Sequence, residues 1–366
     1  MNLYNSNKYL EDIAYVSGLE LPWERLENKT LALSGATGLI GSFLVDVILN
    51  KNRQENLNCK IYVLGRNEKN VRTRFNAYSF GEAFSFIKYD VNKPVPFETN
   101  DEFDYVLHLA SNTHPLQYAT DPIGTITTNI VGLQHMLELA KAHSSERFVF
   151  ASSNEIYGEN RGDTEFFDED YCGYIDSNTM RAGYPESKRC GEALCQAYIY
   201  QKDMEIVIPR FTRSYGPTMK LTDSKAISQF IRNGIQGEDI VLKSAGTQLY
   251  SYTYAADAVS GLLVILLKGA RGEAYNIADA GSDIMLKDLA HIIAEHTGGK
   301  AVFEAPDETE EAGFSRATKA RLSGDKIKAL GWQPKYNIEE GICRTIDILK
   351  HTINQDREKM DFERNR

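Results

Sequence analysis

A tyrosine and a lysine four residues apart, Tyr184 and Lys188, form the pattern with the clearest chemical use in this sequence. On a helix this spacing places both side chains on one face, one turn apart. An ammonium group near a phenol favours the phenolate and lowers a pKa that starts near ~10. The pair is therefore expected to act as a base toward an alcohol near neutral pH. The alternative interpretation is a Tyr–Lys pair on the protein surface that has no catalytic role.

A glycine-rich turn follows the apolar segment at residues 30–34 and precedes an apolar-periodic segment. Strand, turn and helix in this order bind the pyrophosphate of a dinucleotide. In this interpretation Gly35 permits the tight turn, Gly38 admits the phosphates and Gly41 lets the helix pack on the strand. An ordinary glycine loop is the alternative. The expected cofactor contacts here are Gly35, Thr37, Gly38, Leu39, Ile40 and Gly41.

The second expected strand, residues 60–64, ends without the carboxylate that commonly binds a ribose 2′-hydroxyl. Arg66 and Asn67 stand there instead. An ion pair between Arg66 and a 2′-phosphate favours NADP slightly over NAD. A solvated Arg66, with Asn67 on the ribose, is the alternative and fits NAD.

Two further strands are expected to contribute to the cofactor site. Asp90 and Val91 follow the segment 84–89, where the carboxylate can accept from the adenine amino group and the valine can pack on the ring. His108, within the apolar segment 105–111, is interpreted as a packed core residue. Small residues at the end of this segment leave room for the cofactor backbone, and Leu109, Ala110 and Ser111 are the expected cofactor contacts.

A fifth expected strand, residues 147–151, delivers Ser153, Asn154 and Glu155 at its carboxyl end. That edge of an open parallel sheet is where ligands bind. The Ser153 hydroxyl can hold an alcohol beside Tyr184. Glu155 is a candidate base in the same place, and a solvated loop acid otherwise.

The alternation of strands and helices predicts an α/β fold, a Rossmann-type doubly wound parallel sheet with a smaller C-terminal α/β substrate domain. Helical spacing of apolar residues predicts a crossover helix at 123–142. The expected divisions are an N-terminal arm at 1–28, an NAD(P)-binding domain at 29–214, a substrate-binding domain at 215–350 interleaved with the first, and a charged, frayed tail at 351–366.

Composition restricts the partners. The 366 residues carry a formal net charge of −10 and no basic stripe, which disfavours nucleic acid. No apolar run of ~18 residues is present, so no membrane span is expected. The first residues lack the pattern of a signal peptide. Five cysteines, without metal-ligand spacing, indicate reduced thiols in the cytoplasm and no metal site.

The glycine turn, Ser153 and the Tyr184-x-x-x-Lys188 pattern resemble the extended short-chain dehydrogenase/reductases, and within them the NAD-dependent epimerase/dehydratase group acting on nucleotide sugars. The resemblance covers about residues 28–350. Residues 180–189 look most like UDP-glucuronate decarboxylases. The resemblance implies a cofactor contact at Asn129 and a homodimer formed by the crossover helix and the helix of Tyr184.

Three positions depart from the family pattern. Arg213 stands where the family usually carries an Asn, and Tyr250 where it carries an Arg that grips the nucleotide diphosphate. The swap suggests a different substrate or a phosphate contact from Arg213. Asn154 replaces the Asp that expels water in 4,6-dehydratases, which weakens the dehydratase interpretation. Asn154, Arg213 and Tyr250 are thus the expected substrate contacts.

The resemblance implies transient oxidation of a sugar hydroxyl, with C4 as the expected position. Tyr184 takes the proton, Lys188 lowers its pKa, Ser153 positions the alcohol, and Glu155 serves as base or proton donor at the neighbouring carbon. Epimerisation, decarboxylation and reduction stay open as outcomes. An NADPH-dependent carbonyl reductase with a non-nucleotide substrate and a non-catalytic dinucleotide-binding protein are the alternatives.

Overall fold

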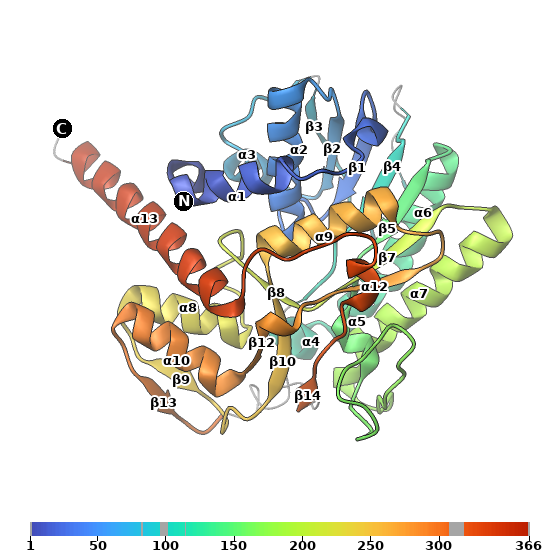
Figure 1. Cartoon of the computed structure of the whole chain (residues 1–366). Helices are drawn as coiled ribbons and strands as arrows, with labels where there is room; N and C mark the ends of the chain where they lie inside the picture. Colours follow the sequence, from blue (N-terminus) through green and yellow to red (C-terminus); the bar gives the residue numbers. More distant parts are fainter. Residues whose placement is uncertain (1, 82, 96–101, 114, 307–317, 365–366) are drawn as a thin grey trace.

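A parallel sheet forms the centre of the protein (Figure 1). Its strands lie in the order β3-β2-β1-β4-β5-β7-β11, and the short β6 pairs with β7. The order reverses between β1 and β4, the kind of switch point where doubly wound sheets bind ligands. The strands are β1 (Thr30–Ser34), β2 (Lys60–Gly65), β3 (Phe84–Lys88), β4 (Tyr105–His108), β5 (Arg147–Phe150), β6 (Ser152–Ser153), β7 (Ile206–Phe211) and β11 (Ala274–Ile277). This computed structural model describes residues 2–81, 83–95, 102–113, 115–306 and 318–364.

Alternating side chains along the strands supply two cores, one on each face of the sheet. Leu31 and Leu33 pack in one core with Val149, whereas Ala32 packs in the other with Phe148. Helices cover both faces, which confirms the doubly wound prediction. These helices are α2 (Leu39–Glu55), α3 (Glu68–Arg74), α4 (Pro115–Thr120), α5 (Pro122–Thr127), α6 (Leu133–Ala142), α7 (Gly183–Lys202) and α9 (Ala255–Lys268).

The crossover segment predicted at 123–142 is helical but interrupted. A π-helical turn at Thr128–Gly132 joins α5 to α6. Such turns are frequent at functional sites because they redirect one side chain without ending the helix. Asn129, within this turn, is fully buried.

A second lobe lies beside the carboxyl ends of the central strands. It holds a small sheet in the order β12-β10-β14, with β8 paired to β10, and a separate pair β13-β9. Helix α9 and strand β11 follow β10 but return to the central sheet, so β11 extends it beyond the six strands expected. The elements of this lobe are β8 (Arg213–Tyr215), α8 (Ala226–Gln236), β9 (Ile240–Leu242), β10 (Leu249–Tyr254), β12 (Asp283–Met285), α10 (Leu286–Thr297), β13 (Ala301–Phe303), β14 (Lys319–Ala320) and α13 (Ile338–Arg364). Helix α12 (Asp325–Lys328) packs on β11 and α9 of the central sheet.

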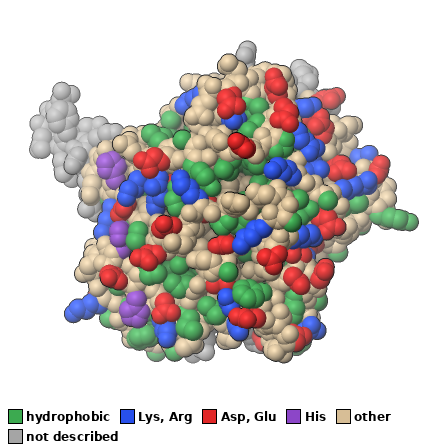
Figure 2. Space-filling model, viewed as in Figure 1, with side chains coloured by type: hydrophobic (Ala, Val, Ile, Leu, Met, Phe, Trp, Pro, Cys, Tyr) green, Lys and Arg blue, Asp and Glu red, His purple; other side chains and the backbone are tan. Residues whose placement is uncertain are grey.

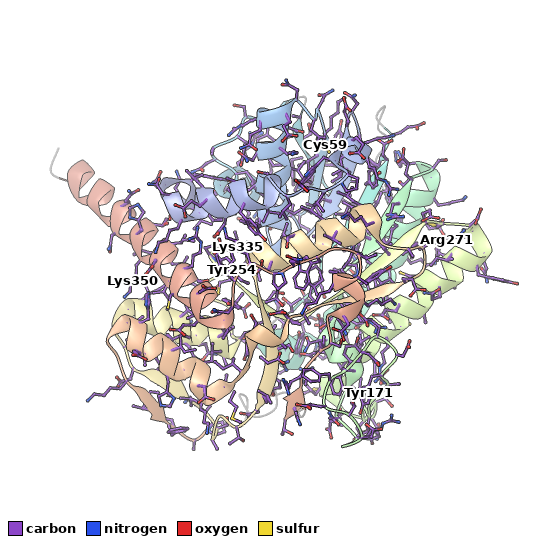
Figure 3. The ribbon with its side chains drawn as sticks, viewed as in Figure 1. Cys59, Tyr171, Tyr254, Arg271, Lys335 and Lys350 are labelled. Carbon is purple, nitrogen blue, oxygen red and sulfur yellow. The ribbon has the colours of Figure 1, made fainter. Side chains whose placement is uncertain are left out.

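The N-terminal arm is tied to both parts of the chain. Its helix α1 (Asn7–Ser17) packs on α2 and α9. The fully buried Asp12 carboxylate accepts hydrogen bonds from Tyr254 Oη (2.6 Å), Tyr336 Oη (2.8 Å) and Arg344 Nε (2.7 Å). Figure 3 labels Tyr254 and Lys335 at this junction. A buried carboxylate satisfied by three donors holds the arm against α13 and β10.

Helix α13 continues to Arg364, so the boundary expected at residue 351 falls inside one helix, and the backbone of the predicted frayed tail is helical up to that residue. Residues 365–366 lie outside the described residues. On the face shown in Figure 2, acidic and basic side chains are interspersed. Among the described helices, none combines the length and the apolar character needed to cross a membrane.

Candidate active site

Tyr184 and Lys188 lie together at the carboxyl end of β5, at the start of α7. Both side chains are buried, with relative exposures of 6% and 2%. The Lys188 ammonium nitrogen donates to the Ala151 carbonyl at 2.7 Å and lies 5.9 Å from the centroid of the Tyr184 ring. This bond fastens the first turns of α7 to the end of the strand that leads to Ser153.

Ser153 and Glu155 approach the Tyr184 phenol from the segment after β5. Ser153 is the last residue of β6, and its hydroxyl accepts the backbone N–H of Glu155 at 3.2 Å. The hydroxyls of Ser153 and Ser111 are hydrogen-bonding neighbours of the phenol. The structure therefore assembles all four predicted catalytic side chains around one point.

The electrostatics of Tyr184 differ from the sequence-based expectation. Burial, followed by the neighbouring Glu155 charge, raises the pKa of Tyr184 above its usual value, while Ser153, Arg181 and Ser111 lower it. The expected net lowering of the Tyr184 pKa is wrong for this geometry, because burial outweighs the groups that lower it. Burial lowers the pKa of Lys188 to about 7, partly offset by the nearby Glu192 carboxylate.

Two residues of the site escaped the sequence analysis, Arg181 and Tyr118. Arg181 forms an ion pair with Glu155 at 2.7 Å (Nη2 to Oε2), and its guanidinium carbon lies 4.8 Å from the centroid of the Tyr118 ring. The Tyr118 ring stacks on Tyr184 with centroids 4.8 Å apart and an interplanar angle of 23°. Arg181 thus holds Glu155 and, through Tyr118, helps to fix the plane of the Tyr184 ring.

A chain of hydrogen bonds connects the π-helical turn to α7. The Ser111 hydroxyl donates to Asn129 Oδ1 at 2.7 Å, and Asn129 Nδ2 donates to the Ser187 hydroxyl at 2.9 Å. Ser187 in turn donates to the Tyr184 carbonyl at 2.8 Å. The carboxamide of Asn129, predicted as a cofactor contact, therefore links the segment after β4 to the helix of Tyr184.

The glycine turn forms a close cradle at the switch point. Gly35 has a φ of +80°, and a Cβ there would lie 2.6 Å from the Ala110 nitrogen. A Cβ at Gly41 would lie 2.4 Å from the Gly35 oxygen. Helix α2 begins after Gly38 with no side-chain cap, so its first N–H groups are available to a phosphate. Thr37, Leu39 and Ile40, half-buried, complete the turn. These residues fit the pyrophosphate of a dinucleotide.

The other predicted cofactor contacts lie at the carboxyl ends of β2, β3 and β4. Arg66 is exposed after β2, while the Asn67 carboxamide oxygen caps α3 by accepting from the Asn70 N–H at 3.2 Å. Asp90 accepts from the Asn92 N–H at 3.1 Å and Val91 is buried. Leu109 and Ala110 lie against Gly35. His108 is fully buried, as predicted, and burial lowers its pKa to about 3.

The predicted substrate contacts share a pocket on the other side of the catalytic residues. Asn154, Glu155, Arg181 and Arg213 line it. Tyr250 contributes indirectly, because the Arg213 guanidinium carbon lies 3.4 Å from the centroid of its ring. The pocket therefore brings the guanidinium groups of Arg181 and Arg213 together with Glu155, the candidate acid–base group.

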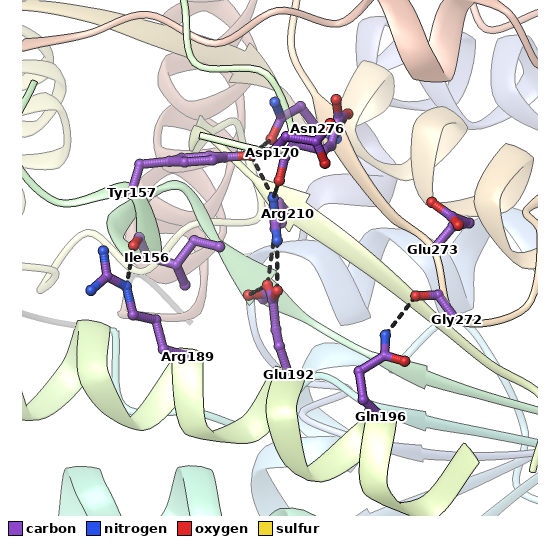
Figure 4. A network of polar contacts seen from close by, with 12 residues as sticks. Ile156, Tyr157, Asp170, Arg189, Glu192, Gln196, Arg210, Gly272, Glu273 and Asn276 are labelled. Carbon is purple, nitrogen blue, oxygen red and sulfur yellow. Dashed lines mark hydrogen bonds and ion pairs between the residues drawn. The ribbon is translucent and has the colours of Figure 1, made fainter. Parts of the chain in front are cut away.

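A buried ion pair behind the site anchors α7 to the sheet (Figure 4). Arg210 on β7 makes two bonds to the Glu192 carboxylate, at 3.0 and 2.7 Å, and one to the Tyr157 hydroxyl at 2.8 Å. Glu192 also accepts from the Ser152 hydroxyl at 2.5 Å. This pairing, one turn beyond Lys188, fixes the helix relative to the segment that carries Ser153.

Known proteins place the chain in a family. It matches the model of the NAD dependent epimerase/dehydratase family over residues 31–278. UDP-glucuronic acid decarboxylase 3 of Arabidopsis thaliana is 32% identical over 86% of this chain and 87% of its own length. UDP-glucuronic acid decarboxylase 1 of Xenopus tropicalis is 30% identical over 89% of this chain and 73% of its own. The chain belongs to the NAD dependent epimerase/dehydratase family, a family of enzymes, as its motifs predicted.

Solved structures share the fold. UDP-glucose 4-epimerase of Thermotoga maritima, solved with UDP-glucose, has a TM-score of 0.73 at 22% identity and covers 88% of this chain and 99% of its own. UDP-glucuronic acid 4-epimerase of Bacillus cereus, solved with UDP-glucuronic acid and NAD, has the same score, identity and coverages.

The buried Lys188 predicts a pH-dependent stability. Between pH 7 and ~10.4, the unfolded chain holds a proton on this lysine that the folded chain has released, so the contribution of Lys188 to stability rises with pH by at most about 1.4 kcal/mol per unit. Urea unfolding of the natural protein and of Lys188→Met at pH 7 and 9 measures this contribution to the free energy of unfolding. The difference between the two unfolding free energies should shift in favour of the natural protein at pH 9. An unchanged difference would show that Lys188 keeps its ordinary pKa.

Proposed function

We propose that this enzyme transiently oxidises a hydroxyl of a nucleotide sugar with NAD or NADP and returns the hydride within the same turnover. The observation that carries the proposal is the Tyr184 phenol, flanked by the Ser153 and Ser111 hydroxyls and by Lys188, beside the glycine cradle. Membership of the family and the named activities of the relatives support it.

The cradle residues Gly35, Gly38 and Gly41 would hold the cofactor pyrophosphate at the start of α2. When bound, the cofactor supplies a hydride acceptor for the alcohol carbon. The side chains of the protein hold the substrate hydroxyl and accept its proton. Ser153 orients the substrate hydroxyl, and Tyr184 takes its proton as the carbon is oxidised. Positive charge brought close to the phenol favours this transfer, since burial alone opposes it.

Glu155 is assigned to the second half of the reaction. The ketone formed on the sugar acidifies the neighbouring C–H and weakens the bond to a β-carboxylate. The ion pair with Arg181 orients Glu155, so the carboxylate can serve as a base or, once protonated, return a proton at that carbon. Asn154, which cannot donate a proton as an Asp does, favours decarboxylation or epimerisation over loss of water. UDP-glucuronic acid is the first substrate to test, because the relatives are named for its decarboxylation.

A simple NADPH-dependent carbonyl reductase is the second candidate, and the exposed Arg66 favours it. The two reactions differ in their net consumption of cofactor. The reductase consumes one NADPH per product, whereas the proposed reaction consumes none.

Tyr184→Phe tests the assignment of the proton acceptor. Because a positioned acid–base group contributes about 10²–10⁴-fold, turnover of an accepted nucleotide sugar should fall by at least ~10². Cofactor binding, followed by fluorescence of the bound reduced nicotinamide, should stay within about twofold. Turnover that survives within tenfold would exclude Tyr184 as the acid–base residue.

The NADP preference rests on Arg66. Arg66→Ala should weaken NADP binding about tenfold, the usual worth of one charge-assisted hydrogen bond, and leave NAD binding nearly unchanged. Calorimetric titration with both cofactors measures this, and Lys69→Ala, an exposed cation on the following helix, is the matched control. Equal effects on both cofactors, or a natural protein that binds NAD more tightly, would contradict the preference.

We further infer a homodimer formed through the α5–α7 face. Ile123 is 76% exposed, and Ile126 and Val131 are each 37% exposed on the crossover segment packed against α7. Ile123→Glu together with Ile126→Glu should halve the mass measured by light scattering, because charges at an apolar interface are left unpaired. Phe303→Glu, at a 59% exposed position on the second lobe, is the control and should leave the mass unchanged. A natural protein that is monomeric at micromolar concentration would refute the dimer.

The five cysteines are free thiols in the structure, which supports a reducing compartment, and we infer a cytoplasmic location.

A further inference from the structure

Two fully buried carboxylates with the same set of partners fasten the N-terminal arm to the rest of the protein. One is Asp12, on the arm itself, which accepts from two phenols and one guanidinium, those of Tyr254, Tyr336 and Arg344. The other is Asp46, on α2, which also accepts from two phenols and one guanidinium. In this second cluster the arm supplies both phenols. The arm is therefore attached at two places by the same kind of contact.

The Asp46 cluster joins the arm to two helices at once. The Tyr4 hydroxyl donates to Asp46 Oδ1 at 2.7 Å, and the Tyr9 hydroxyl donates to Asp46 Oδ2. Arg74, the last residue of α3, pairs with the same carboxylate. Its two terminal nitrogens also donate to the hydroxyls of Tyr4, at 2.8 Å, and Tyr9, at 2.7 Å. Burial raises the pKa of both phenols, so each keeps the proton that it donates.

The two helices joined in this way begin at the two ends of the adenosine half of the cofactor site. Helix α2 starts after Gly38, where its first N–H groups face the place of the pyrophosphate. Helix α3 starts after Asn67, at the end of the second strand, which in this kind of fold adjoins the adenosine ribose. Because α3 is only seven residues long, a rigid contact at Arg74 also fixes its first turn. Figure 1 shows α1 lying beside α2, with α3 close to both.

We propose that Tyr4 and Tyr9 are positioning residues for the cofactor: they hold α3 against α2 and so set the affinity for the adenosine half of the dinucleotide. If both hydroxyls are removed, Asp46 loses two donors and Arg74 loses two acceptors in a buried place. Such a loss is costly, and a shift of α3 toward solvent relieves it. The proposal requires a dinucleotide at the glycine cradle, and it holds whichever substrate the enzyme oxidises.

The likeness of the two clusters provides a matched pair of variants. Tyr4→Phe with Tyr9→Phe removes two phenol donors from one carboxylate, and Tyr254→Phe with Tyr336→Phe removes two from the other, while every ring is kept. Both double variants should unfold at a lower temperature by a similar amount. Calorimetric titration with NAD should show a loss of affinity of about five- to tenfold for the Tyr4/Tyr9 variant, which corresponds to about one hydrogen bond to the cofactor. The Tyr254/Tyr336 variant should bind NAD within about twofold of the natural protein.

Titration with ADP-ribose separates positioning from a general loss of stability. This ligand carries the adenosine and the pyrophosphate but lacks the nicotinamide, so the Tyr4/Tyr9 variant should lose the same factor for it as for NAD. A loss for NAD alone would place the effect at the nicotinamide end and overturn the proposal. Equal losses in the two double variants, or NAD affinity unchanged in both, would also overturn it.

Single variants repeat the comparison if a double variant does not fold. Tyr4 and Tyr336 are both half-buried, and each donates one hydrogen bond to its carboxylate, at 2.7 and 2.8 Å. Tyr4→Phe should weaken NAD and ADP-ribose binding by about two- to threefold, half of the expected free-energy change of the double variant. Tyr336→Phe should leave both affinities unchanged. A loss in Tyr4→Phe no larger than that in Tyr336→Phe would overturn the proposal.

Discussion

The docking of α7 on the carboxyl edge of the central sheet is the constraint on which the site depends. Lys188 reaches the Ala151 carbonyl at the end of β5, and Glu192, one turn further, holds both Arg210 on β7 and the Ser152 hydroxyl. Removing one partner of such a buried pair leaves the other charge desolvated, which costs about 3–5 kcal/mol. The helix and the Ser153 segment are therefore locked in one geometry before any ligand is bound.

This rigidity has an electrostatic consequence. A phenol buried as deeply as Tyr184 resists ionisation, and the adjacent Glu155 carboxylate raises its pKa further. Arg181 counters that carboxylate at 2.7 Å, and the neighbouring Ser153 and Ser111 hydroxyls lower the pKa of Tyr184. Burial lowers the pKa of Lys188 to about 7, and its hydrogen bond to the Ala151 carbonyl fixes the position of α7. In the proposed reaction, charges close to the phenol, including those that a ligand brings, would decide when the proton moves.

Local patterns allowed much of this to be predicted from the sequence. The i, i+4 spacing of Tyr184 and Lys188 and the strand–glycine–helix order at Gly35 are properties of short segments, and the structure has both as expected. The Arg181–Glu155 pair and the stack of Tyr118 on Tyr184 join residues 26 and 66 positions apart, which no short-range pattern encodes. The return of β11 to the central sheet escaped for the same reason.

The pKa of Tyr184 shows a second kind of property that the sequence alone could not predict. The sequence places a cation next to a phenol but does not reveal how deeply both are buried, and burial determines the direction of the shift here. The role of Asn129 was likewise out of reach, because it depends on a π-helical turn that aims one carboxamide at Ser111 and Ser187.

The central claim is that one carbon of the substrate gives up a hydride and regains it within a single turnover. Its most direct test follows UDP-glucuronic acid labelled with deuterium at C4 through the reaction. The account predicts that the label is retained at C4 of the product and that no reduced cofactor accumulates. Deuterium released on the nicotinamide in proportion to product, or exchanged into solvent from C4, would contradict it.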